Sequence, residues 1–168
     1  LIRTEDDATE NLIEEYNWVI GAEFADSIGA DIINSSLGYN TFSQPYMNHT
    51  FSDMDGQTNI STIGANKAAS RGILVSISAG NEGNSNWGRI VSPADADSCL
   101  AIGAVDGNGN YAALSSRGPS ADFEIKPNLA SQGFGTVYST TQGNILTGNG
   151  TSFSAPIISG MAACLWQA

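Results

Sequence analysis

Residues 12–37 read LIEEYNWVIGAEFADSIGADIINSSL, and the class of the fold follows from this stretch. Its first part, residues 12–28, repeats apolar side chains at the spacing of an amphipathic helix. Gly29 follows where a helix would need a C-terminal cap, and residues 31–37 then form a short apolar run. We therefore predict a helix, a glycine stop and a short buried strand.

The same unit returns further along the chain. Residues 59–71 have a second helical pattern, Gly72 closes it, and residues 73–78 form another apolar run. Two successive helices that each lead through a glycine into a strand are typical of a parallel sheet covered by helices. The prediction for the whole chain is an α/β fold of three layers, with helices on both faces of a mainly parallel sheet.

The remaining elements are predicted from weaker patterns, and polar, glycine-rich loops separate them. Further strands and a last helix are expected at residues 99–105, 111–115, 136–141 and 152–168. The side chains of the last helix that suit burial are Ala155, Ile158, Met161, Ala162 and Leu165. No segment has the composition of a linker, so residues 1–168 are expected to form one domain.

The balance of charge argues against two kinds of anionic partner. The 168 residues contain 6 Lys and Arg against 17 Asp and Glu, a net charge of −11. Binding to nucleic acid or to an anionic membrane surface depends on clustered Lys and Arg, so neither is expected. No apolar run reaches the roughly 20 residues that cross a bilayer.

Cys99 and Cys164 lie in apolar stretches and are expected to be buried free thiols, although a disulfide between them stays open.

Three short segments carry side chains suited to chemistry. Residues 150–156 place Ser152 between a glycine-rich turn and the last helix, where unpaired amides favour negative charge. Residues 78–83 place Asn81 just after a strand, and residues 34–38 end another strand. Taken singly, these segments are also typical of a helix cap, a turn and a strand end. Open parallel sheets form their sites at the carboxyl ends of strands, so we expect the three segments to converge there.

Together these segments resemble those of the subtilases. GADIINSSLG over residues 29–38 is similar to the family's substrate strand, SAGNEG over residues 78–83 to its oxyanion segment, and GTSFSAP over residues 150–156 to its serine segment. Shorter similar stretches lie at residues 92–93, 103–106, 115–119 and 125–127. The resemblance covers about residues 15–168 and implies a subtilisin-like fold that is incomplete.

The resemblance implies a serine endopeptidase that hydrolyses polypeptides through an acyl-enzyme. Ser152 would be the nucleophile, and Asn81 would donate a hydrogen bond to the oxyanion together with the amide of Ser152. The substrate-binding residues would be Ser36, Leu37 and Gly38 along the peptide and Ser78, Ala79 and Gly80 in the wall of the first specificity pocket.

The resemblance also bears on cofactors and location. It implies that catalysis requires no cofactor and no metal, and that the protein is secreted or held at the cell envelope. Subtilases often bind structural calcium, and Asp53, Asp55 and Gln57 offer oxygen ligands in the long polar loop expected over residues 38–58, although a solvated acidic loop is the plainer interpretation.

The sequence departs from the family in its catalytic triad. Subtilases place Asp, then His, then Ser along the chain. The one histidine here, His49, lies after the substrate strand in a polar run and is expected to be a surface loop residue. We therefore predict the serine-bearing, C-terminal part of a catalytic domain, inactive alone because the triad acts as a unit. The exposed sheet edge of such a part is expected to be buried by self-association.

Two other classes of protein fit less well. An α/β-hydrolase needs glycine at position 154, where serine stands, and an Asp and a His after the nucleophile, yet no histidine follows Ser152. A non-catalytic module could hold peptides in the same groove, but it would need neither Ser152 nor Asn81. This peptide-binding pseudoprotease is the alternative to the enzyme.

Overall fold

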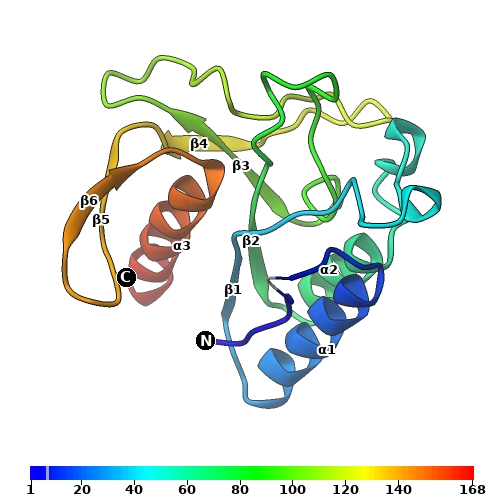
Figure 1. The fold of residues 1–168 in the computed structure, drawn as a ribbon. Coiled ribbons are helices and arrows are strands. Elements are labelled where there is room, and N and C mark those ends of the chain that lie inside the picture. The colour runs from blue at the N-terminus through cyan, green and yellow to red at the C-terminus, as the bar shows by residue number, and fades with distance from the viewer. Residues whose placement is uncertain (7) are drawn as a thin grey trace.

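The computed structural model describes residues 1–6 and 8–168, and its centre is a parallel sheet with the strand order β1-β2-β3-β4 (Figure 1). The strands of this sheet are β1 (Ile32–Ser35), β2 (Leu74–Ser78), β3 (Leu100–Val105) and β4 (Leu129–Gln132). Helix α3 (Thr151–Gln167) lies along one face, whereas α1 (Ile13–Ser27) and α2 (Ile60–Ser70) cover the other. The predicted three-layer α/β fold is confirmed.

Both glycine stops lie where the sequence predicted them. Gly29 has a φ of +76°, which favours glycine, and its amide donates to Asp26 O at 3.0 Å. The amide of Ala30 donates to Ala25 O at 3.0 Å, which completes the pair of hydrogen bonds that ends α1. Gly72 follows α2 with a φ of +94°. Each helix therefore turns directly into the next strand of the sheet.

The two helices on this face pack closely because Gly64 of α2 leaves room for Val19 of α1. A Cβ atom added to Gly64 would lie 2.6 Å from Val19 Cγ2, closer than real Cβ atoms come. Beside this contact, the buried indole of Trp18 donates from Nε1 to Ser35 Oγ at 2.9 Å. Helix α1 thus holds the carboxyl end of β1, directly before the predicted substrate-binding residues Ser36, Leu37 and Gly38.

The prediction of a buried strand at residues 31–37 is wrong in one respect, because β1 lies at the edge of the sheet. Within the described residues it pairs with β2 alone, Asn34 is exposed, and Ile32 and Ile33 are only partly buried. Strands β2 and β3 each have two neighbours, and most of their side chains are buried. The position of a strand in the sheet decides its burial, and an apolar run does not encode that position.

The later strands differ from the prediction. Residues 111–115 are not a strand, because Tyr111 forms one isolated bridge with Val105 and the chain then turns. Strand β4, which the sequence did not predict, pairs with β3 in parallel. The strand expected at residues 136–141 is present as β5 (Thr136–Ser139), antiparallel to the unpredicted β6 (Ile145–Gly148).

Only the first half of α3 is buried as predicted. Ala155 is fully buried, and Ile158 and Ala162 are partly buried. Met161 and Leu165 are 63% and 79% exposed, so their predicted burial is wrong. Among the described residues, no helix has the length and apolar character needed to cross a membrane.

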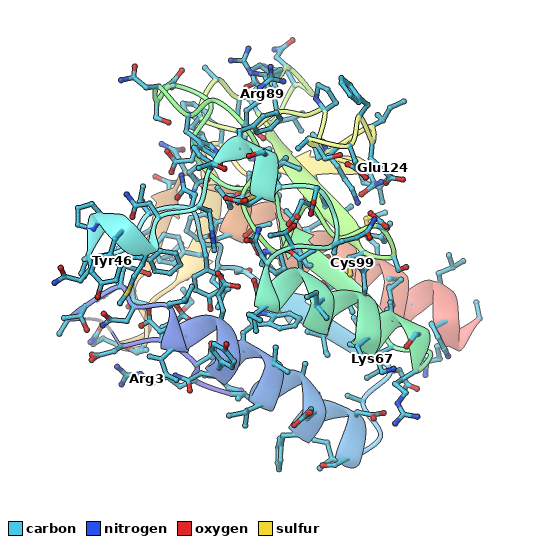
Figure 2. All side chains as sticks on the ribbon, turned by 90° about the vertical axis from the view of Figure 1, so that its right-hand side faces the viewer. Arg3, Tyr46, Lys67, Arg89, Cys99 and Glu124 are labelled. Carbon is cyan, nitrogen blue, oxygen red and sulfur yellow. The ribbon has the colours of Figure 1, made fainter. Side chains whose placement is uncertain are left out.

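The two cysteines are free thiols with different surroundings. Cys99 is buried in the core cluster that includes Ala65 and Ala68 of α2 (Figure 2). Burial raises the pKa of its thiol to about 12, so it stays protonated at neutral pH. Cys164 is exposed on α3, which contradicts the prediction that both thiols are buried.

His49 is not the surface residue that the sequence predicted. Its Nε2 hydrogen-bonds to Glu15 of α1, whose side chain is fully buried, and its ring meets Phe42 edge-on at 5.2 Å between centroids. The second oxygen of Glu15 accepts the amide of Ser61, at the start of α2, at 3.0 Å. The long loop over residues 38–58 is therefore fastened to both helices.

A chain of buried hydroxyls leads from this pair to a second carboxylate. Ser61 Oγ lies 2.6 Å from Ser92 Oγ, which lies 2.9 Å from Thr62 Oγ1. Thr62 Oγ1 donates to Asp95 Oδ1 at 2.7 Å, and the amide of Gly56 donates to Asp95 Oδ2 at 3.1 Å. These bonds join α2 to the loop after β2, and the loop before α2 is bonded to the same carboxylate.

Asp95 is expected to make the stability of the fold depend on pH. Burial raises its pKa from 3.8 to about 6, although hydrogen bonds from Thr62 and Gly56 favour the charged form. Because the folded pKa lies above the unfolded one, its contribution is fully present below about pH 4 and is lost as the pH rises through about 6. The loss is on the order of 3 kcal/mol.

Urea unfolding at pH 4 and pH 7 checks this expectation. In Asp95→Asn, position 95 cannot titrate, so the stability of the native protein relative to the variant should fall by roughly 2.5 kcal/mol between the two pH values. A difference that stays constant would contradict the assignment to Asp95.

Candidate active site

The start of α3 and the loop after β2 are joined by hydrogen bonds at the carboxyl end of the sheet. The amide of Thr151 donates to Asn81 Oδ1 at 2.8 Å, and Thr151 Oγ1 donates to the same oxygen at 3.1 Å. The amide of Gly80 donates to Thr151 Oγ1 at 3.2 Å. The segments 78–83 and 150–156 therefore lie together, as the sequence predicted.

These bonds orient the side-chain amide of Asn81. Its oxygen accepts two hydrogen bonds from Thr151, whereas its Nδ2 has no partner within the described residues. The Asn81 residue is exposed at the surface. An amide held by its oxygen keeps two N–H donors free for a ligand beside the first turn of α3.

Ser152 lies in that first turn, where helix amides lack intrahelical partners. Its Oγ donates to Ser36 O at 3.2 Å, and Ser36 Oγ donates to Ser152 O at 3.1 Å. These reciprocal bonds tie the serine to the residue that follows β1. The Ser152 side chain is partly buried, so its hydroxyl remains within reach of solvent.

The third segment joins the same junction. Ser78 Oγ lies 3.4 Å from Leu37 O, which links the end of β2 to the end of β1. Ser36 and Gly38 are exposed and Leu37 is partly buried, so this stretch borders an open face. Ser78 and Ala79 are almost fully buried, which leaves Gly80 as the most accessible residue of the predicted pocket wall. All three predicted segments thus meet at one place.

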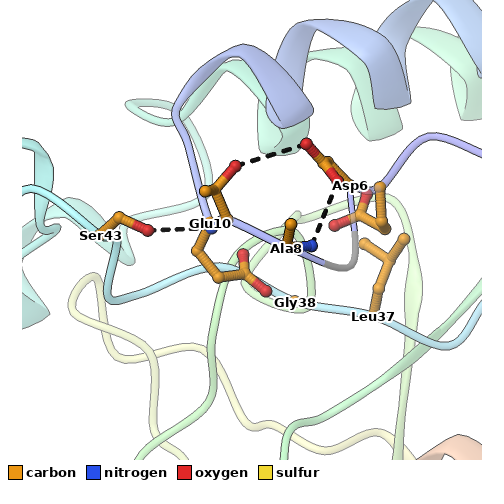
Figure 3. A pocket seen from close by; sticks show the side chains of 8 residues that line it. Asp6, Ala8, Glu10, Leu37, Gly38 and Ser43 are labelled. Atoms are coloured by element: carbon orange, nitrogen blue, oxygen red, sulfur yellow. Dashed lines mark hydrogen bonds between the residues drawn. The ribbon is translucent and has the colours of Figure 1, made fainter.

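A pocket of about 480 Å³ opens beside this junction (Figure 3). Leu37 and Gly38 line one side, and Glu5, Asp6 and Glu10 are among the residues that line the other. Burial, followed by the neighbouring carboxylates, raises the pKa of Glu10. The predicted substrate strand is therefore flanked by an acidic wall that the sequence alone did not place.

Among the described residues, none that bonds to Ser152 Oγ is a base. The hydroxyl donates to a backbone carbonyl, and His49, in the long loop, is bonded to Glu15 of α1. The prediction that His49 is not the base of Ser152 agrees with these contacts, although the expected surface position was wrong.

Thr151 is a candidate functional residue that sequence reasoning missed. It is fully buried and supplies both donors that hold Asn81. Its position directly before the serine was visible in the sequence, but its partner lies 70 residues away along the chain.

The two aspartates of the long loop that were predicted as calcium ligands accept hydrogen bonds from the loop's own backbone. Asp53 Oδ2 accepts the amide of Thr50 at 2.6 Å, and Asp55 Oδ1 accepts the amide of Thr58 at 2.8 Å. Both carboxylates therefore cap turns within the loop. Structural calcium, in this loop or elsewhere, stays a prediction.

Comparison with known proteins gives a consistent result. The model of the subtilase family matches residues 4–168. Over 153 residues, the chain is 36% identical to subtilisin E of Bacillus subtilis, matching 90% of this chain and 35% of that protein. The subtilisin of Bacillus pumilus is also 36% identical, and the match covers 90% of this chain and 48% of that protein. The chain thus spans between a third and a half of these relatives.

Solved structures agree with the sequence relatives. The self-cleaved protease domain of PatA has a TM-score of 0.71 to this chain at 26% sequence identity, and the match covers 90% of this chain and 51% of that domain.

Proposed function

The chain belongs to the subtilase family, and from this premise we propose that it carries the nucleophile and the oxyanion site of a serine protease. The observation that supports this most directly is the junction at which Asn81 and Ser152 meet, linked through Thr151. The activity proposed here is that of the complete protein that contains these 168 residues.

In this proposal Ser152 Oγ attacks the carbonyl carbon of the scissile peptide bond. A general base takes the hydroxyl proton, the C–N bond breaks, and the same group returns the proton to the leaving amine. Water then hydrolyses the acyl-enzyme on Ser152. The hydrogen bond from Ser152 Oγ to Ser36 O is long, at 3.2 Å, and therefore weak. The hydroxyl could give it up and donate to a general base instead.

The negative charge that develops on the carbonyl oxygen would be stabilised by two donors. Asn81 Nδ2 is one, and the amide of Ser152, in the first turn of α3, is the other. Thr151 would act as a positioning residue, because it fixes the oxygen of Asn81 and so directs the nitrogen. Donors fixed before the reaction need no reorganisation during it.

The substrate would be an extended polypeptide that runs along Ser36, Leu37 and Gly38. These residues continue from the edge strand β1, so their backbone can pair with an added strand. A peptide in this position would bring its carbonyl group to the first turn of α3, because Ser36 is bonded to Ser152.

The general base is proposed to come from outside these 168 residues. His49 is the one histidine of the sequence, and Glu15 holds its Nε2. Secretion or attachment to the cell envelope, and self-association of the isolated chain through the edge of β1, also remain predictions.

Substitutions of Asn81 in the complete protein test the oxyanion role. Asn81→Ala is expected to lower kcat for peptide hydrolysis by about 10²–10³-fold with little change in KM. This magnitude is taken from removal of the asparagine oxyanion donor in subtilisin. Asn81→Asp keeps an oxygen for the amide of Thr151 but loses the Nδ2 donor, so it should lose as much.

The matched control is Asn84→Ala, an exposed asparagine of the same loop, which should leave kcat unchanged. Full activity in Asn81→Asp would show that residue 81 acts only by accepting the hydrogen bonds of Thr151, and not as an oxyanion donor. No hydrolysis by the unsubstituted complete protein, together with binding of peptides, would instead favour a non-catalytic peptide-binding module.

A further inference from the structure

The side chain of Val91 lies between the two segments that we assign to substrate binding. A Cβ atom added to Gly38 would lie 2.4 Å from Val91 Cγ2, and one added to Gly80 would lie 2.9 Å from the same carbon. Real Cβ atoms essentially never come closer than 3.0 Å to another heavy atom. One methyl group therefore touches the substrate strand on one side and the pocket wall on the other.

Val91 cannot easily move away from this position. It is 4% exposed, and its β-branched side chain has few accessible rotamers. Next to it, the amide of Ile90 donates to Arg117 O at 3.0 Å. On its other side, Ser92 and Tyr39 exchange backbone hydrogen bonds of 3.2 and 2.7 Å. The backbone around Val91 is thus fixed at both ends.

The wall opposite Val91 is fixed as well. Gly80 has a φ of +104°, and a Cβ atom added there would lie 2.8 Å from Ser116 Oγ. The amide of Ser116 donates to Gly80 O at 2.9 Å, and Ser116 Oγ accepts the amide of Glu82 at 2.9 Å. The wall is therefore braced from behind, and a bulky substrate side chain could not push it back.

We infer that Val91 forms the floor of the pocket for the substrate residue whose carbonyl is attacked, and that this protease cleaves after Gly, Ala or Ser. A side chain that enters between Gly38 and Gly80 meets the γ-methyl groups of Val91 instead of open space. Forcing a larger group into a filled and rigid site strains its packing, so aromatic and long aliphatic side chains are rejected. This inference rests on the proposed function and adds its substrate class.

Paired peptides that differ only in the residue before the scissile bond test the inference on the complete protein. The ratio of kcat/KM for alanine over phenylalanine is expected to exceed about 10, given the selectivity of apolar pockets for single carbon groups. In Val91→Ala the ratio should fall by at least about 10-fold. Val137→Ala removes the same two methyl groups from an exposed position on β5 and should leave the ratio unchanged.

Two further measurements control for misfolding of the variant and separate binding from catalysis. Thermal melting shows whether Val91→Ala folds, and if it does not, Val91→Leu should narrow the pocket and shift cleavage from alanine toward glycine. Calorimetry with peptides that end in alanine or in phenylalanine, on the Ser152→Ala protein, measures binding without chemistry.

The outcomes separate the two proposals. Cleavage after phenylalanine as readily as after alanine, or a ratio that Val91→Ala does not change, overturns the role of Val91 and leaves the protease intact. Selective binding of the alanine peptide without any cleavage by the unsubstituted protein overturns the protease and keeps the pocket. Neither binding nor cleavage of any peptide overturns both.

Discussion

Replacing Ser152 by alanine is expected to abolish peptide hydrolysis by the complete protein. Ser152 is the one group in our mechanism that forms a covalent bond to the substrate, and its hydroxyl is bonded to Ser36 in the substrate strand. Loss of the nucleophile lowers turnover by about 10⁶-fold in subtilisin, which sets the scale of the effect.

The measurement is hydrolysis of an unstructured protein, together with labelling of the active serine by a fluorophosphonate. The matched control is Ser159→Ala, which removes a hydroxyl two turns further along the same helix, where it bonds to Asn34 Oδ1 at 3.0 Å. This control should keep activity within about two-fold, because the Ser159 hydroxyl is bonded neither to Ser152 nor to Asn81. Hydrolysis that survives in Ser152→Ala would reject Ser152 as nucleophile. This outcome needs no separate folding control, because an active variant must be folded.

The convergence of the three segments could be predicted from the sequence for a physical reason. Residues 34–38 and 78–83 each follow a strand, and parallel strands present their carboxyl ends at the same edge of the sheet. Local pattern and topology together therefore placed Ser36, Asn81 and Ser152 near one another. The hydrogen bonds that join them confirm that proximity.

Other features could not be predicted because they depend on what lies across space. Strand β4 reads Leu-Ala-Ser-Gln and has no apolar pattern, so only its pairing with β3 identifies it. Met161 and Leu165 follow the helical spacing of a buried face, yet among the described elements none covers them. A repeat along the chain shows which side chains share a face but does not show how far the neighbouring layer extends.

The polar partners of buried groups were missed for the same reason. His49 was expected at the surface because its sequence neighbours are polar, but Glu15 lies 34 residues away and provides a buried acceptor. Val91 reads as an ordinary apolar residue in a loop, and its role emerges only from its contact with Gly38 and Gly80. Specificity in this site is therefore a property of packing between distant segments.

The isolated 168-residue chain is expected to lack useful peptidase activity. Activity should return when the remainder of the complete protein is added. Without a base, the hydroxyl of Ser152 is a poor nucleophile, and losing one member of a triad costs about 10⁴–10⁶-fold in turnover. Adding in trans a polypeptide with the remainder of the complete protein should restore hydrolysis, because it would supply the base and could pair with the exposed edge of β1.

Activity is measured with the same unstructured protein, and light scattering follows the size of the chain before and after the addition. Self-association that disappears as activity returns would indicate that both depend on the same edge of the sheet. The informative variant is His49→Ala. It should not affect the restored turnover, because the ring of His49 is bonded to Glu15 of α1 and not to Ser152. Rapid hydrolysis by the isolated chain that His49→Ala abolishes would place the base within these residues and contradict our mechanism.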